Sequence, residues 1–189
     1  MKSIAILMLL IVAPAPQVSA ACFDFPENSM PACGFESENE INQWTIHLGS
    51  IALTAAPIHS GTGAAYLTSM TSGSIEGVSV EMDCFPVSGS GGVGYGIYVF
   101  PVSGPISCFV TGSFCVDADC SGFCSSVTSS TYGIPVGEWT LIKMEAAPFS
   151  PGARFGISCE SSTPFEVVAD DGYWGEGMVP VSLQAFVVD

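Results

Sequence analysis

The chain has 189 residues and a formal net charge of −15, with 18 acidic and only 3 basic side chains. This composition excludes nucleic acid as a partner, because neutralising a phosphate backbone requires several Lys or Arg side chains. The same charge disfavours anionic lipids and acidic polysaccharides, so neutral glycans, cations and other proteins remain as candidate partners.

The first twenty residues have the pattern of a secretory signal. Lys2 supplies a positive charge, residues 4–12 are apolar without interruption, and Val18-Ser19-Ala20 is a small-residue cleavage site. We therefore expect residues 1–20 to be removed after Ala20, leaving one mature domain of residues 21–189 that is secreted or periplasmic. No later apolar run is long enough to span a bilayer.

All eight cysteines lie after the predicted cleavage site: Cys22, Cys33, Cys84, Cys108, Cys115, Cys120, Cys124 and Cys159. An even number in an exported chain favours a disulfide framework without a free thiol. The alternative, acylation of the first cysteine, needs a large aliphatic residue in place of Ser19 and leaves one cysteine without a partner. We expect Cys22 to pair with Cys33, Cys84 with Cys159 or with the hairpin, and the other pairs to form within residues 108–124.

Short alternating runs, separated by turns rich in Gly, Pro, Ser and Asp, follow one another along the mature chain. In the clearest of them, residues 78–84, four apolar side chains would face a core and three polar ones water. The expected strands are residues 44–48, 51–54, 64–70, 78–84, 93–102, 106–116, 123–132, 139–146, 153–160, 165–169 and 179–188. With no segment of sustained helical period, this series predicts an all-β, antiparallel jelly-roll β-sandwich stapled by disulfides.

The segment Asp117-Ala118-Asp119-Cys120-Ser121-Gly122 joins two of these strands. It begins like the calcium loop of an EF-hand but has Thr128 where the closing acid would stand. A polar hairpin tip is therefore favoured over a calcium site.

Four motifs in a fixed order carry a resemblance to a known family. They are Gly34-Phe35-Glu36 followed by Trp44, then His59-Ser60-Gly61, then Gly137-Glu138-Trp139-Thr140, then residues 165–171 with their paired acids. In this order the chain resembles the jelly-roll carbohydrate-binding modules of the family 4/9 type, within the galactose-binding-like sandwiches. The resemblance extends over nearly the whole mature chain.

The resemblance implies one structural calcium ion. In such modules the glutamate of the opening motif and an aspartate of the closing strand hold the ion together with main-chain carbonyls, which here implies Glu36, Asp170 and residues 60–63. Calcium suits such a set because it accepts six to eight oxygen ligands in loose geometry.

The resemblance also implies that aromatic rings stack on sugars, on one sheet face or in loops at its edge. The candidate ligand-binding rings are Tyr95, Tyr98, Phe109, Tyr132, Tyr173 and Trp174. Trp44 and Trp139 are expected in the core, where the family buries its tryptophans. For each single ring, ordinary packing is the competing interpretation.

Catalytic motifs are absent from the sequence: it contains neither G-x-S-x-G nor H-E-x-x-H. Asp170 and Asp171 are adjacent, and adjacent residues of a regular strand point to opposite faces, so they are not expected to flank one bond. The sequence thus favours a secreted, non-catalytic module that binds neutral glycan. The alternative is an extracellular structural or adhesive protein of the same fold without a sugar site, and exposed rings on one face would separate the two.

Overall fold

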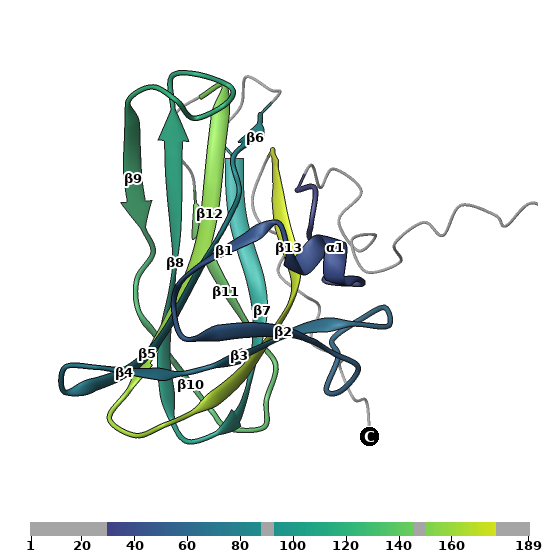
Figure 1. The fold of residues 1–189 in the computed structure, drawn as a ribbon, viewed down its shortest axis with the longest axis vertical. Coiled ribbons are helices and arrows are strands. Elements are labelled where there is room, and N and C mark those ends of the chain that lie inside the picture. Colours follow the sequence, from purple (N-terminus) through teal and green to yellow (C-terminus); the bar gives the residue numbers. More distant parts are fainter. Residues whose placement is uncertain (1–29, 88–92, 146–149, 177–189) are drawn as a thin grey trace, which may run out of the picture.

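The computed structural model describes residues 30–87, 93–145 and 150–176, which form a sandwich of two antiparallel sheets (Figure 1). The all-β sandwich expected from the sequence is therefore confirmed. The 8-stranded sheet has the order β1-β5-β12-β8-β10, with β4 beside β5, β6 beside β12 and β9 beside β8. The 5-stranded sheet has the order β11-β7-β13-β3-β2.

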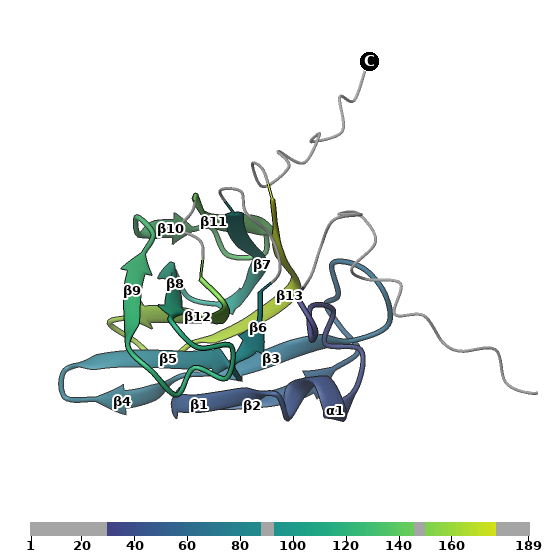
Figure 2. The same ribbon diagram turned by 90° about the horizontal axis from the view of Figure 1, so that it is seen from above.

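The strands of the 8-stranded sheet are β1 (Trp44–Leu48), β4 (Met70–Ser72), β5 (Ile75–Met82), β6 (Phe85–Pro86), β8 (Ile106–Cys115), β9 (Cys124–Thr128), β10 (Tyr132–Ile134) and β12 (Gly152–Ser161). Those of the 5-stranded sheet are β2 (Ser50–Thr54), β3 (Ala64–Thr68), β7 (Val93–Ser103), β11 (Thr140–Glu145) and β13 (Glu166–Glu176). A helix of one turn, α1 (Glu38–Ile41), lies beside β2 at the edge of the sandwich (Figures 1 and 2).

The period-two pattern of the sequence decides which side chains meet between the sheets. In β12, Ala153, Phe155, Ile157 and Cys159 are buried, whereas the side chains between them point outward. The ring of Phe155 lies 4.6 Å from that of Tyr95 in the facing sheet, measured between centroids. Contacts of this kind close one continuous core between the two sheets.

Strand β13 is longer than the sequence suggested. We expected strands at residues 165–169 and 179–188 separated at Asp171-Gly172, but β13 continues through this point to Glu176. The pairing with β7 shifts register between Asp170 and Tyr173, and Asp171 has a positive φ of 48°. A bulge therefore absorbs the extra residues without ending the strand. Residues 179–188 lie outside the described residues.

The tryptophans divide between two environments. Trp44 packs in the core, as expected, with its ring 5.1 Å from that of Phe35. Trp139 is half-buried and packs on the outer face of the 5-stranded sheet, against Tyr98 and Tyr173. The core assignment of Trp139 was therefore wrong, because this residue precedes β11 and the sequence does not fix its direction.

Three disulfides join described cysteines: Cys84–Cys120, Cys108–Cys159 and Cys115–Cys124. The Cys84–Cys120 bond confirms that Cys84 pairs with the hairpin between β8 and β9. The Cys115–Cys124 bond is a local pair within residues 108–124, as expected. The expectation that Cys108 pairs within residues 108–124 was wrong, as was the alternative pairing of Cys84 with Cys159. Cys108 and Cys159 lie opposite each other on β8 and β12, which sequence distance does not reveal. Cys33 is also disulfide-bonded, and Cys22 lies outside the described residues.

The hairpin tip between β8 and β9 is compact and polar. The Asp119 carboxylate accepts hydrogen bonds from the backbone N–H and the hydroxyl of Ser121, at 3.1 and 2.7 Å. These two hydrogen bonds close the turn within the hairpin, as expected for a polar tip. Among the described residues, no helix is long and apolar enough to cross a membrane.

Candidate functional site

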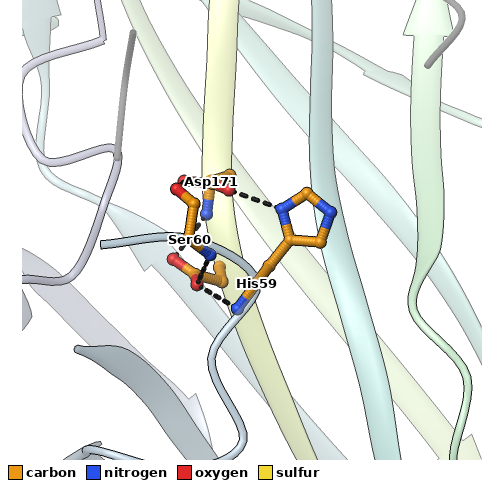
Figure 3. Close-up of polar contacts among 4 residues, drawn as sticks. His59, Ser60 and Asp171 are labelled. Carbon is orange, nitrogen blue, oxygen red and sulfur yellow. Dashed lines mark hydrogen bonds and ion pairs between the residues drawn. The ribbon is translucent and has the colours of Figure 1, made fainter. Parts of the chain in front are cut away.

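The bulge in β13 brings both acids of the closing motif to one turn. The backbone N–H groups of His59 and Ser60 donate to Asp170 Oδ2 at 2.8 and 3.2 Å. His59 Nδ1 lies 2.6 Å from Asp171 Oδ2, and the Ser60 hydroxyl donates to Asp171 Oδ1 at 2.9 Å (Figure 3). The premise that adjacent acids point to opposite faces does not hold here, because the bulge interrupts the strand's alternation.

Asp170 carries the strongest electrostatic perturbation of this cluster. Its side chain is fully buried, and burial, followed by repulsion from the neighbouring Asp171, raises its pKa to about 7. Three backbone N–H groups, those of His59, Ser60 and Asp171, oppose this rise. The carboxylate therefore sits in a pocket of donors that only partly offsets the loss of water.

Glu36 reaches the same loop from the other end of the chain. Its Oε2 accepts from the backbone N–H and the hydroxyl of Thr62, at 2.8 and 2.6 Å. Its Oε1 is buried and has no hydrogen-bond partner among the described residues. An unpaired buried carboxylate oxygen is costly unless a proton or a cation neutralises it. Asp170 and Glu36 thus bind residues 59–62 from two sides.

A cation at this place would need main-chain ligands as well. Among the described residues, no group of three or more His, Cys, Asp or Glu side chains is arranged to hold a metal ion. The donor set available is two carboxylates and the carbonyls of the loop that they bind. Such an all-oxygen set with few charges fits calcium better than zinc or another transition metal.

The loop also covers part of the outer face of the 5-stranded sheet. The His59 ring stacks on Tyr98 with centroids 3.8 Å apart and meets the edge of Trp139 at 5.2 Å. Tyr98 and Tyr173 are buried beneath these contacts. The cluster fixes the loop to the sheet through packing in addition to the carboxylates.

The six candidate sugar-binding rings do not gather on one face. Tyr95 and Trp174 are 0% and 2% exposed in the core, so neither is open to a ligand. Burial raises the pKa of Tyr95, whose hydroxyl has no hydrogen-bond partner within the described part of the chain. Tyr98 and Tyr173 are 6% and 3% exposed and pack with Trp139 and Leu141 on the outer face of the 5-stranded sheet.

The other two candidate rings belong to the 8-stranded sheet. Tyr132 packs against the core and donates its hydroxyl to the carbonyl of Lys143 at 3.0 Å. Phe109 is half-buried on β8 and points away from the core, opposite Ser158 of β12. Only Phe109 is thus both turned outward and partly open.

Phe109 belongs to a band of polar side chains on the outer face of the 8-stranded sheet, which we call the polar strip. Cross-strand pairs set its rows: Ser79 opposes Ser158, which opposes Phe109, and in the next row Glu81 opposes Gly156, which opposes Thr111. The strip consists of Thr45, His47, Ser79, Glu81, Asp83, Ser107, Phe109, Thr111, Arg154, Ser158 and Glu160. Gly156 lets its neighbours on the strip close together, since a β-carbon there would lie 2.9 Å from the Thr111 hydroxyl and 2.8 Å from the Val80 carbonyl.

Each end of the polar strip opens into a hollow. The first, about 290 Å³, is lined by polar side chains that include His47, Glu81, Asp83 and Arg154. The second, about 420 Å³, is lined by Ser107 and Glu160 together with residues of the loops beside β8 and β10. Arg154 and Glu160 are six residues apart on β12, so the strip is roughly 20 Å long at the usual rise of an extended strand.

Sequence reasoning did not single out the polar strip, although its signal was present. The alternation in residues 153–160 places Arg154, Ser158 and Glu160 on the outward phase of a strand. Which residues of β5 and β8 lie beside them depends on strand order and register, and a single sequence does not contain these.

Comparisons with known proteins identify the fold. No protein-family model matches the sequence, and neither does any curated protein. The solved structure of TmCBM61 in complex with β-1,4-galactotriose is similar at a TM-score of 0.59 and 16% identity, covering 79% of this chain and 99% of that one. The C-terminal family 22 carbohydrate-binding module of Clostridium thermocellum Xyn10B is similar at 0.57 and 11%, covering 79% and 94%.

A third similar structure is part of an enzyme. The xylanase 10B fragment of Clostridium thermocellum with CBM22-1 and GH10 modules, complexed with xylohexaose, has a TM-score of 0.54 and 16% identity, covering 77% of this chain and 28% of that one. At such identities the likeness concerns the fold. The fold is therefore that of β-sandwich carbohydrate-binding modules such as those of families 22 and 61, and the finer likeness to the 4/9 type rests on the sequence motifs.

Proposed function

We propose that this protein is an exported, non-catalytic module that binds a neutral glycan along the polar strip. The observation that carries the proposal is the arrangement of the strip itself: an outward, half-exposed ring at Phe109 among hydroxyl and charged groups, with a hollow at each end. Sugars are bound by rings that cover their apolar faces and by polar groups that pair with their hydroxyls.

The length and charge of the strip define the ligand class. A band of roughly 20 Å along one strand accommodates several sugar units of an extended chain, whereas a single monosaccharide would fill one hollow. The carboxylates of Glu81, Asp83 and Glu160 face only one guanidinium, that of Arg154, across the strip. Anionic glycans are therefore disfavoured, and the hydroxyls of a neutral chain would find both donors and acceptors.

Support for a binding rather than a catalytic role comes from the fold. The similar solved structures include binding modules without an enzyme domain, and the sequence contains neither G-x-S-x-G nor H-E-x-x-H. The three disulfides support an oxidising compartment, in agreement with export through the signal expected at residues 1–20.

The proposal includes one structural calcium ion held by Glu36, Asp170 and nearby main-chain carbonyls. The unpaired, buried Oε1 of Glu36 and the raised pKa of Asp170 support it, since a cation would relieve both. When bound, calcium would supply positive charge between the first motif and the closing strand. The protein's own residues keep the loop in place through the contacts of His59, Ser60 and Thr62.

The test is a glycan array of neutral and acidic polysaccharides, followed by calorimetry on the best neutral ligand. We expect Phe109→Ala to weaken binding roughly tenfold, as the loss of one stacked ring would. Glu160→Gln should also weaken binding, because the second hollow loses its carboxylate acceptor. Phe123→Ala is the matched control, because Phe123 is 77% exposed on the hairpin tip, away from the strip. If Phe109→Ala and Phe123→Ala weaken glycan binding equally, the polar strip is not the binding site.

The second candidate is a structural or adhesive extracellular protein of the same fold. One specific observation favours it: four of the six rings expected to bind sugar are buried. Absence of binding to every neutral glycan of the array, by a correctly folded chain with and without calcium, would select this candidate.

A further inference from the structure

A row of aromatic side chains crosses the outer face of the 5-stranded sheet. Phe100 of β7 opposes Val168 of β13, and Val168 opposes Tyr66 of β3. The ring of Trp139 lies 5.3 Å from that of Phe100 and extends the row beyond β7. We call Trp139, Phe100 and Tyr66 the aromatic row; all three are half-buried, so part of each ring is open.

The row is separate from the polar strip. The strip belongs to β1, β5, β12 and β8, whereas the row belongs to β7, β13, β3 and the residue before β11. The two lie on the outer faces of opposite sheets, with the whole core between them. None of the three rings was among the ligand-binding candidates from the sequence, and Trp139 was assigned to the core.

The spacing of the rings suits a repeating ligand that lies across the strands. Phe100 and Tyr66 are two strands apart, which separates them by roughly 10 Å. This separation is of the order of two sugar units in an extended chain, so each ring would meet every second unit. Val168 is buried between them and gives the row an apolar floor.

The polar groups beside the row are mostly acceptors. Glu166 is hydrogen-bonded to the Tyr66 hydroxyl at one end of the row. Asp171 holds the His59 ring that contacts Trp139 at the other end. Asp171 is 2% exposed and its two oxygens already contact His59 and Ser60, so the Glu166 carboxylate is the acceptor that faces a ligand. Its charge disfavours an anionic ligand and complements one rich in O–H donors. In a chain with a net charge of −15, this complementarity also disfavours a second copy as the occupant.

We propose that the aromatic row is a second glycan-binding platform, on which an extended neutral polysaccharide lies across the strands of the 5-stranded sheet. The choice of neutral polysaccharide as the ligand rests on the proposed function. The location of the site rests only on the positions of the three rings. Two platforms on opposite faces make the domain bivalent, so that it cross-links polysaccharide chains. Bivalence would raise retention on an insoluble polysaccharide above that of either face alone.

Tryptophan fluorescence tests this platform selectively. Trp44 and Trp174 are 4% and 2% exposed in the core, so Trp139 is the one tryptophan that a bound sugar can contact. Titration with xylohexaose and β-1,4-galactotriose, the sugars bound in the similar structures, should change the emission of the wild type and of Phe109→Ala alike. Tyr66→Ala should weaken the fluorescence-detected affinity roughly tenfold, and Tyr66→Phe should retain most of it.

Pull-down with insoluble xylan and cellulose completes the test, with melting temperatures showing that each variant is folded. We expect Phe109→Ala and Tyr66→Ala each to leave residual retention, and the double variant to leave none. Loss of all retention in Phe109→Ala, with unchanged emission, overturns the platform and leaves the polar strip intact. Loss only in Tyr66→Ala supports the platform and overturns the strip. No binding by the wild type overturns both, and a dimer that Tyr66→Ala dissociates assigns the row to a second copy.

Discussion

The 8-stranded sheet is fixed by covalent bonds, whereas the 5-stranded sheet is joined to its covering loop by hydrogen bonds to carboxylates. All three disulfides between described cysteines connect strands or loops of the 8-stranded sheet. On the other side, Asp170, Asp171 and Glu36 hold residues 59–62 through hydrogen bonds to backbone and hydroxyl groups.

Disulfides and carboxylate contacts stabilise the fold differently: the former act on the unfolded chain and the latter on the folded one. A disulfide acts mainly by restricting the unfolded chain, so its effect depends little on pH or ions. A buried carboxylate acts through its native contacts, and its contribution changes with protonation and with bound cations. The 8-stranded side should therefore respond to reductant and the 5-stranded side to pH and chelator.

The largest expected effect is removal of the Cys108–Cys159 bridge. The chain-entropy relation gives about 4 kcal/mol for its separation of 51 residues, against about 2.6 kcal/mol for the separation of 9 residues at Cys115–Cys124. Paired Cys→Ala variants, unfolded with urea, measure both losses. A larger loss for the Cys115–Cys124 pair would contradict this order.

The second effect is a pH dependence that originates in Asp170. Its pKa of about 7 in the fold exceeds its ordinary value of 3.8, so folding favours the protonated form. The resulting stabilisation is complete below about pH 4 and is lost as the pH rises through about 7. In chelator, the free energy of unfolding should fall by up to about 1.4 kcal/mol per pH unit in this window.

Urea unfolding at several pH values measures this slope. Asp170→Asn is the matched control, because it keeps the shape of the side chain and removes the titration. An identical slope in the variant and the wild type would assign the pH dependence to other groups.

Chelation of calcium should have the next largest effect. Calcium at about 100 times its dissociation constant adds roughly 2.7 kcal/mol, which moves the melting temperature by several degrees. Glu36→Gln and Asp170→Asn should each abolish the shift, and Asp117→Asn on the hairpin tip should preserve it. The same melting temperature in calcium and in chelator would exclude the structural ion.

The smallest effect compares one serine from each side. Ser60 donates to the buried carboxylate of Asp171, whereas Ser79 shares a neutral hydrogen bond of 2.8 Å with Ser158. Bonds to charged groups contribute about 1.5–3 kcal/mol and neutral ones about 0.5–1.5 kcal/mol. Ser60→Ala should therefore cost more stability than Ser79→Ala in thermal unfolding. A larger loss of stability in Ser79→Ala would show that the Ser60–Asp171 bond contributes less than the neutral Ser79–Ser158 bond.

Local pattern was sufficient to predict most strands but not the path through the closing motif. Runs such as residues 93–102 and 106–116 became β7 and β8 with little change, because alternation depends only on neighbours in sequence. Asp171-Gly172 reads as a break, yet β13 pairs with β7 at Asp170 and again at Tyr173, so the two residues stay in the sheet as a bulge. Trp139 was assigned to the wrong face because it lies just outside its strand.

By itself, the sequence determined that this is an acidic, disulfide-stapled all-β chain with outward and inward residues on each strand, since charge, cysteine number and period two are local properties. Only the tertiary structure decided that Cys108 meets Cys159, that Glu36 and Asp170 bind the same loop, and which rings are open. These facts depend on strand order and register. Many arrangements satisfy the same alternation, and the packing of the two sheets selects one of them.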